Sequence, residues 1–245
     1  MKNLIGKIFK TKKDVIYISV ILLLLIAVSV LSVLLVTGHK EDGGILQYYN
    51  EKCAAFELEN ANLAKGQIVF IGDSITDGYV LDDYYSDLTL SVYNRGIGGD
   101  STGGVLKRLD LSVVDIRPSK VVLMIGINDI NGGVSDSVLI KNYGEILEKI
   151  KRELPKTEVY CMSILPVNKE LESYGVDIPK NLERVKKNNI EIKRLAEEYG
   201  YCFVDLFENF LDSEGHLKSE LSIDGIHLNA NGYRLWTEKL KPYLG

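Results

Sequence analysis

Hydrophobic and polar positions divide most of the chain into short apolar runs and longer amphipathic stretches that alternate. Five apolar runs have the length of buried strands, and each is followed by turn residues; they lie at 68–71, 91–94, 120–125, 158–163 and 201–205. Between and after them, apolar residues recur every three or four positions, which predicts helices; these lie near 102–114, 136–153, 181–199 and 230–240. A moderately amphipathic helix is also predicted over 45–64, before the first strand.

This alternation predicts the fold class. A β-α-β-α order favours a parallel sheet with helices on both faces, because each strand must return to the same edge of the sheet through a connecting helix. We therefore expect an α/β protein over 45–245, a three-layer α/β/α sandwich around a central five-stranded parallel sheet of the flavodoxin-like kind.

The N-terminal segment has a different pattern. Residues 15–36 form an uncharged apolar run that is long enough to cross a bilayer as a helix. Lysines precede this run and acidic residues follow it, so the positive-inside rule places residues 1–14 in the cytoplasm and everything after about residue 37 outside. We predict a single-pass signal anchor in the cell membrane, followed by a short linker over 37–44. A cleaved signal peptide is the competing interpretation, but it would have a shorter apolar region and a small-x-small site, which the sequence near Val36 matches poorly.

Charge and cysteine content exclude several classes of function. Residues 1–40 hold six lysines and one aspartate, a charge of +5, so residues 41–245 carry −10 of the overall net charge of −5. An acidic outer domain argues against a nucleic-acid partner. Cys53, Cys161 and Cys202 are too few and too scattered for a disulfide framework or a zinc site. Cys161 and Cys202 lie in apolar runs, which predicts buried thiols, although one disulfide stays open.

Candidate chemistry is concentrated in four short blocks. Gly-Asp-Ser at 72–74 follows a strand, which places Ser74 at the carboxyl edge of the sheet, where α/β proteins bind ligands. The glycine-rich residues 96–99 follow the next strand and can direct backbone N–H groups at a ligand. Asn128 follows a third strand, and its amide can donate to developing negative charge. Asp224 and His227 are three residues apart, so the carboxylate can hold one ring nitrogen while the other faces a serine.

A serine beside a histidine and a carboxylate can act as a nucleophile, and Ser101 competes with Ser74 for that role. Residues 99–103 fit the G-x-S-x-G pattern of α/β-hydrolases, with Ser101 at its centre. In that pattern a strand runs directly into the motif, whereas residues 95–98 separate Gly99 from the strand at 91–94. We therefore prefer Ser74. Asp73 and Asp100 are interpreted as hydrogen-bonding struts of their loops rather than as proton carriers, and Trp236 as part of the core.

In their order and spacing, the four blocks resemble the SGNH (GDSL-type) hydrolase family over about 66–241. The resemblance is strongest to the branch of platelet-activating-factor acetylhydrolase and bacterial carbohydrate O-acetylesterases. It implies Ser74 as nucleophile, His227 as general base and then acid, and Asp224 as the carboxylate that orients His227. It also implies an oxyanion hole formed by the backbone N–H groups of Ser74 and Gly99 and the side chain of Asn128, with no cofactor and no metal.

The resemblance predicts a serine esterase that hydrolyses short acyl esters, acetyl esters above all, carried by a small molecule or a glycan. A lysophospholipase or general acyl-ester lipase is one alternative. An acyltransferase is another, in which a sugar hydroxyl replaces water. A binding module without catalysis is disfavoured because the triad and the oxyanion residues are all present. The stretch 168–179 has no clear periodicity and is expected to form a loop over the site.

Overall fold

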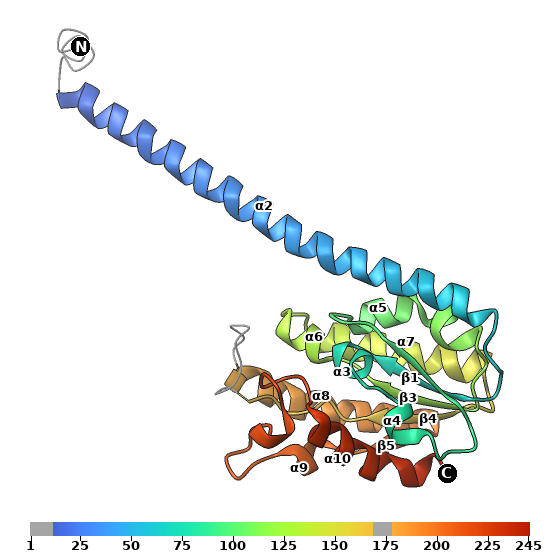
Figure 1. The fold of residues 1–245 in the computed structure, drawn as a ribbon. Helices are drawn as coiled ribbons and strands as arrows, with labels where there is room; N and C mark the ends of the chain where they lie inside the picture. The colour runs from blue at the N-terminus through green and yellow to red at the C-terminus, as the bar shows by residue number, and fades with distance from the viewer. Residues whose placement is uncertain (1–11, 169–177) are drawn as a thin grey trace. The chain divides into compact units, whose positions relative to one another are not determined.

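A parallel sheet of five strands forms the centre of the computed structural model, which describes residues 12–168 and 178–245 (Figure 1). The strands are β1 (Ile68–Gly72), β2 (Val92–Gly96), β3 (Lys120–Met124), β4 (Glu158–Met162) and β5 (Cys202–Val204), in the spatial order β2-β1-β3-β4-β5. All four pairings are parallel. The prediction of a five-stranded parallel sheet is confirmed, and each strand lies close to its predicted position.

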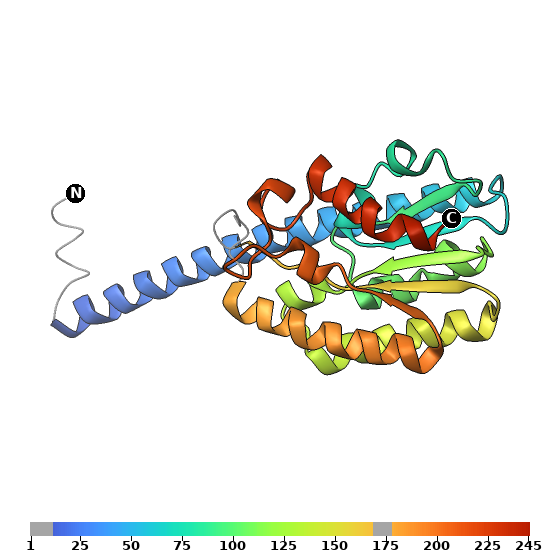
Figure 2. The ribbon, with the colours of Figure 1, turned by 90° about the horizontal axis from the view of Figure 1, so that it is seen from below.

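Helices cover both faces of this sheet. Helices α5 (Thr102–Lys107), α7 (Asp136–Glu153) and α8 (Ile178–Tyr199) pack in a row on one face, and α10 (Ala230–Leu240) lies on the other (Figure 2). Shorter helical segments begin or follow the connecting loops: α3 (Ser74–Asp77), α4 (Asp82–Tyr85), α6 (Ile127–Asn131), α9 (Phe207–Phe210), η2 (Ser219–Leu221) and η3 (Lys241–Tyr243). The inner strands β1 and β3 are buried on both faces over nearly their whole length, which explains why their sequences are apolar runs, whereas the edge strand β2 is only partly buried and carries Asn94 and Arg95.

The helix predicted over 102–114 is interrupted. Helix α5 ends at Lys107, and a π-helical turn, η1 (Asp110–Val114), follows it. Between them, Arg108 turns its side chain into the interior, where it is only 3% exposed. The backbone departs from the regular helix at the residue that directs this charge inward.

Aromatic side chains fill the core between α10 and the sheet. Trp236 is fully buried, as predicted, and its ring centroid lies 5.0 Å from that of Tyr79. Tyr79 in turn packs edge-on against Phe70 of β1 and stacks on Tyr233 of α10. The hydroxyl of Tyr233 donates to the carbonyl of Ile75 at 2.8 Å, so α10 is fixed directly to α3, the helix that begins with Ser74.

Helix α2 (Lys12–Asn60) precedes the sheet and differs from the predicted organisation. It continues through residues 37–44, where a linker was expected, and ends before the predicted limit at residue 64. A glycine weakens a helix by only about 1 kcal/mol, which explains why Gly43 and Gly44 do not interrupt it. The chain divides into two compact units, residues 1–48 and 49–245. Within the described residues, no helix combines the length and the apolar character needed to cross a membrane.

The strand register aligns the segments that carry the predicted chemistry. Gly72, at the end of β1, pairs with Gly96 of β2 and with Met124 of β3. The three loops that follow these strands therefore begin at the same edge of the sheet. Of the stretch 168–179 that was predicted to cover this edge, residues 169–177 lie outside the described part of the chain.

Candidate active site

Three of the predicted residues meet in one hydrogen-bonded chain. Ser74 is the first residue of α3, and its Oγ lies 2.8 Å from Nε2 of His227. Nδ1 of the same imidazole lies 2.7 Å from Oδ2 of Asp224. The fold thus brings a serine that follows β1 into contact with a turn near the other end of the chain. A serine, a histidine and a carboxylate in this order are the arrangement that activates a hydroxyl for attack on a carbonyl.

The turn that carries Asp224 and His227 is held by its own hydrogen bonds. Oδ1 of Asp224 accepts from the backbone N–H of Ile226 at 3.0 Å and of His227 at 2.8 Å. The Ser222 hydroxyl donates to the carbonyl of His227 and accepts from the N–H of Gly225, both at 2.8 Å. Burial by itself raises the pKa of Asp224, but the hydrogen bonds from His227 and Ile226 outweigh burial and lower it. This carboxylate therefore stays ionised beside the imidazole.

The loop after β2 is fixed to the loop after β3. Gly99 adopts a left-handed backbone conformation with φ of 76°, which favours glycine. The Asn128 amide donates to the carbonyl of Asp100 at 2.9 Å, which uses one of its two N–H groups. The carboxylate of Asp129 accepts from the backbone N–H of Thr102 at 2.9 Å and from its hydroxyl at 2.6 Å. The structure thus places Asn128 directly beside the loop that carries Gly99.

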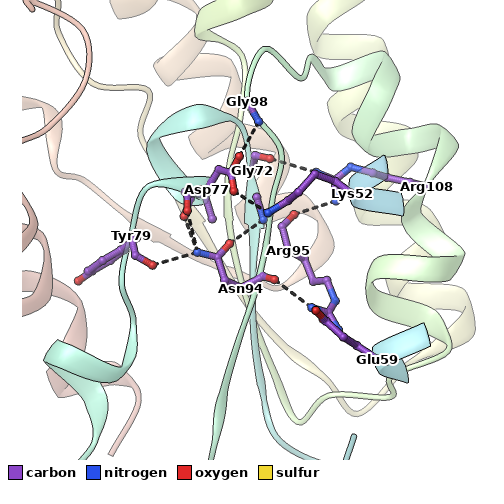
Figure 3. A network of polar contacts seen from close by, with 11 residues as sticks. Lys52, Glu59, Gly72, Asp77, Tyr79, Asn94, Arg95, Gly98 and Arg108 are labelled. Carbon is purple, nitrogen blue, oxygen red and sulfur yellow. Dashed lines mark hydrogen bonds and ion pairs between the residues drawn. The ribbon is translucent and has the colours of Figure 1, made fainter. Parts of the chain in front are cut away.

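A buried ion pair between Arg108 and Asp100 stabilises the loops at the carboxyl ends of β1 and β2. Nε of Arg108 lies 2.7 Å from Oδ2 of Asp100, and both side chains are 2% exposed. The same guanidinium donates to the carbonyl of Arg95 at 2.8 Å and of Gly72 at 3.0 Å (Figure 3). Arg108 therefore joins the carboxyl ends of β1 and β2, and the strut role predicted for Asp100 is confirmed.

Asp73 is the second predicted strut. It caps α3, where its Oδ1 accepts from the N–H of Ile75 at 3.0 Å, and it is 1% exposed. Burial raises the pKa of Asp73 to about 7, and the neighbouring carboxylates of Asp100 and Asp129 act in the same direction. The hydrogen bond to Ile75 confirms the strut role of Asp73. The raised pKa of its carboxyl group was not predicted from the sequence.

Asn94, near the end of β2, ties that strand to α3. Its Nδ2 donates to the carbonyl of Thr76 at 2.7 Å and of Tyr79 at 2.9 Å, while its Oδ1 accepts from the N–H of Gly96 at 2.8 Å (Figure 3). A side chain at position 96 would not fit, because its Cβ would lie 2.2 Å from the backbone nitrogen of Asp77. The backbone of α3 therefore packs directly against the backbone at the end of β2.

The competing serine has a different environment. Ser101 is the N-cap residue of α5, and its Oγ accepts from the N–H of Gly104 at 3.3 Å. This is an ordinary capping role, whereas the Ser74 hydroxyl is bonded to an imidazole. The three cysteines are free thiols, so no disulfide joins them. Within residues 12–168 and 178–245, no group of histidine, cysteine and acidic side chains could hold a metal ion.

Sequence comparison decides the family. The family model of the GDSL-like lipase/acylhydrolases matches residues 70–235, well over half of the chain. The chain belongs to this family. As a member of this acylhydrolase family, it is a serine ester hydrolase, and the resemblance seen in the four sequence blocks is confirmed.

Known proteins show how widely this acylhydrolase fold is shared. Platelet-activating factor acetylhydrolase IB subunit alpha1 of Bos taurus is 29% identical over 172 residues, which cover 68% of this chain and 70% of the bovine protein. A candidate platelet activating factor protein from Streptococcus pneumonia superposes with a TM-score of 0.79 at 32% identity, covering 84% of this chain and 97% of that one. An acetylxylan esterase from Geobacillus stearothermophilus, at 22% identity and a TM-score of 0.60, covers 75% of this chain and 95% of its own and shows the same fold.

A shallow groove lies beside the serine and histidine of the acylhydrolase. Its lining comes from the end of α3, from α4, from the segment leading into α10 and from α10 itself: Gly78 and Val80, Asp83 and Tyr84, Ile223, Leu228 and Asn229, and Ala230 and Tyr233. Val80 is 59% exposed and Ile223 is 70% exposed. Two apolar side chains are thus exposed to solvent in the groove beside Ser74.

Several residues that shape this site were not singled out from the sequence. Asn94, Asp77 and Arg108 act on backbone groups of distant segments, and such contacts have no sequence motif. Arg108 offered one signal, a charge on the inward side of an otherwise amphipathic stretch. Asn94 and Asp77 offered none.

Proposed function

We propose that this acylhydrolase cleaves short acyl esters, above all acetyl esters, through an acyl-enzyme formed on Ser74. The observation that carries the proposal is the hydrogen-bonded chain from the Ser74 hydroxyl through His227 to Asp224, with distances of 2.8 Å and 2.7 Å. Membership of the acylhydrolase family indicates the class of reaction, and the hydrogen bonds among Ser74, His227 and Asp224 indicate which residues would carry it out.

The first half of the reaction forms the acyl-enzyme. Oγ of Ser74 attacks the carbonyl carbon of the ester while Nε2 of His227 takes the hydroxyl proton. The anionic Asp224 stabilises the resulting imidazolium. The tetrahedral intermediate then collapses, its bond to the alcohol oxygen breaks, and His227 returns the proton to the leaving alcohol. An ester between the acyl group and Ser74 remains.

The second half releases the acid. Water takes the place of the alcohol and gives one proton to His227 as its oxygen attacks the acyl carbon. Collapse of the second tetrahedral intermediate breaks the bond to Ser74 Oγ, which receives the proton back. In both halves we assign the oxyanion to the N–H groups of Ser74 and Gly99 and to the Asn128 side chain, whose second N–H is not used by Asp100.

The proposed substrate is an acetyl ester on carbohydrate. Two similar proteins support the acetyl group, since one is named an acetylhydrolase and another an acetylxylan esterase. The open groove beside the nucleophile supports a bulky alcohol. A second candidate, hydrolysis of longer acyl or lipid esters, is favoured by one observation: Val80 and Ile223 expose apolar surface at the groove, which an acyl chain could cover.

The cellular location is proposed from the sequence pattern alone. The lysine-rich N-terminus and the uncharged run over 15–36 support a cell-membrane protein with its catalytic domain outside the cytoplasm. Fractionation of cells that express the full chain tests this location. Esterase activity is expected in the membrane pellet, and activity confined to the cytoplasmic fraction would refute it.

The catalytic proposal is tested with p-nitrophenyl acetate, butyrate and octanoate, followed by acetylated xylo-oligosaccharides, using the full chain. We expect Ser74→Ala to lower kcat more than about 1,000-fold, because the nucleophile is lost. Ser101→Ala is the matched control and should keep its activity. Acetate should be the best of the three nitrophenyl esters.

Each other outcome has a definite meaning. Preference for octanoate would replace the short-acyl proposal with the longer-acyl candidate. Loss of activity in Ser101→Ala alone would show that the nucleophile is wrongly assigned. A wild-type protein that releases no acid from any of these esters would refute the proposed activity.

A further inference from the structure

One carboxylate connects the helix of the nucleophile to the loop of the predicted oxyanion hole. Asp77 is the last residue of α3, which begins with Ser74. Its Oδ2 accepts from the backbone N–H of Gly98 at 3.0 Å, directly before Gly99 (Figure 3). The position of the Gly99 N–H relative to Ser74 therefore depends on this side chain.

The same carboxylate forms an ion pair with helix α2. Nζ of Lys52 lies 2.8 Å from Oδ1 of Asp77, and the two side chains are 28% and 15% exposed (Figure 3). An ion pair with this degree of burial is less screened than one on the open surface. Lys52 lies outside residues 70–235, which the family model matches.

Lys52 is held in place by the end of α2. Phe56, one turn further along the helix, is 3% exposed, and the Lys52 ammonium lies 5.4 Å from its ring centroid. The guanidinium of Arg95 lies 4.4 Å from the same centroid and pairs with Glu59 at 2.8 Å. The last turns of α2 are thus attached to β2, and the ammonium is placed before substrate arrives.

We propose that Lys52 and Asp77 are positioning residues for the oxyanion hole, an inference that rests on the proposed role of Gly99. Asp77 fixes the loop through the N–H of Gly98. Its negative charge by itself would oppose the oxyanion that develops nearby, and the paired ammonium of Lys52 offsets that charge. The end of α2 is therefore a working part of the active site.

The two roles make different predictions for single and double variants. Lys52→Met removes the cation and leaves the carboxylate, so kcat for p-nitrophenyl acetate should fall about tenfold or more with KM changed less than about twofold. Asp77→Asn keeps an acceptor for the N–H of Gly98 and removes the opposing charge, so kcat of this variant should fall less, by about threefold. The double variant should be more active than Lys52→Met alone, and Lys52→Arg should restore most of the activity.

A transition-state analogue gives a second measurement. A boronic acid forms a tetrahedral anionic adduct with a catalytic serine, so its affinity reports the oxyanion hole directly. In Lys52→Met its Kd should rise by the same factor by which kcat/KM falls. Lys149→Met is the matched control, because it breaks the Lys149–Asp110 ion pair, also 2.8 Å long, outside the site. It should change neither quantity.

The experiment separates failure of this inference from failure of the proposed function. If Ser74→Ala is inactive but Lys52→Met keeps wild-type kcat and boronate affinity, the inference alone is wrong. If Ser74→Ala is fully active, the proposed function fails first. A purely structural ion pair would lower the activity of both single variants in proportion to their loss of Tm, without any rescue in the double variant, and that result would also overturn the inference.

Discussion

At the scale of single residues, Asn128 connects the structure of the site most directly to its chemistry. One amide N–H donates to the carbonyl of Asp100, and the proposed mechanism assigns the other to the substrate oxyanion. The oxyanion exists mainly in the transition state. Asn128→Ala should therefore lower kcat about 100- to 1,000-fold, a loss of about 3–4 kcal/mol, and change KM little.

Steady-state kinetics with p-nitrophenyl acetate check this prediction. Asn142→Ala is a suitable control. Nδ2 of Asn142 donates to Oγ1 of Thr102 at 3.1 Å, close to the site, but Asn142 has no proposed contact with substrate. Its kcat should stay within about threefold of wild type. A change in KM alone for Asn128→Ala would remove this residue from the oxyanion hole.

The residues that could be predicted from the sequence share a local signal. Ser74 and Asn128 each follow an apolar run within a few residues, and the spacing of Asp224 and His227 suits a turn in which a carboxylate holds an imidazole. Lys52 has no such signal. It lies on an ordinary helical stretch before the first strand, and its partner Asp77 becomes its neighbour only when α2 packs against β2.

At the scale of elements, the inner strands β1 and β3 were predictable because burial on both faces requires apolar residues at nearly every position. The helical segments were less predictable where a buried polar contact overrides periodicity. Arg108 is the clearest case, since it ends α5 and is bonded to Asp100, Gly72 and Arg95. The pattern of apolar residues alone would have continued the helix to residue 114.

Arg108 should accordingly matter for the stability of the folded protein. Arg108→Met leaves the Asp100 carboxylate buried without its cation and removes donors from two strand ends. Loss of one partner of a buried ion pair typically destabilises a protein by about 3–5 kcal/mol.

Urea unfolding measures the effect of Arg108→Met on the free energy of unfolding. Lys149→Met, which breaks a partly exposed pair, should lower the free energy of unfolding by at most about 1 kcal/mol. Similar values for the two variants would show that Arg108 is not the central support of the site.

At the scale of the whole molecule, the catalytic edge of the sheet is built over buried charge. Asp73, Asp100 and Asp129 lie together there and are each at most 5% exposed, with Arg108 as the cation paired to one of them. Parallel topology makes this clustering unavoidable, because the polar residues that follow β1, β2 and β3 all arrive at the same edge. The sequence predicted the edge, but not that one of these carboxylates would hold a proton near neutral pH.

The stability of the molecule should therefore depend on pH through Asp73. Its pKa is raised from 3.8 to about 7 by burial and by the neighbouring carboxylates, so the folded state keeps a proton that the unfolded state releases. This contribution to stability is fully present below the unfolded pKa and is lost as pH rises through the folded pKa. Asp73→Asn keeps the acceptor for Ile75 and removes the titration. Relative to wild type, the variant should gain stability between pH 4 and pH 8, by up to about 4 kcal/mol. Urea unfolding of both proteins at the two pH values measures this difference, in which other titrating groups cancel. A difference that does not change with pH would mean that folding does not raise the pKa of Asp73, and that the hydrogen bond from the N–H of Ile75 offsets the burial of its charge.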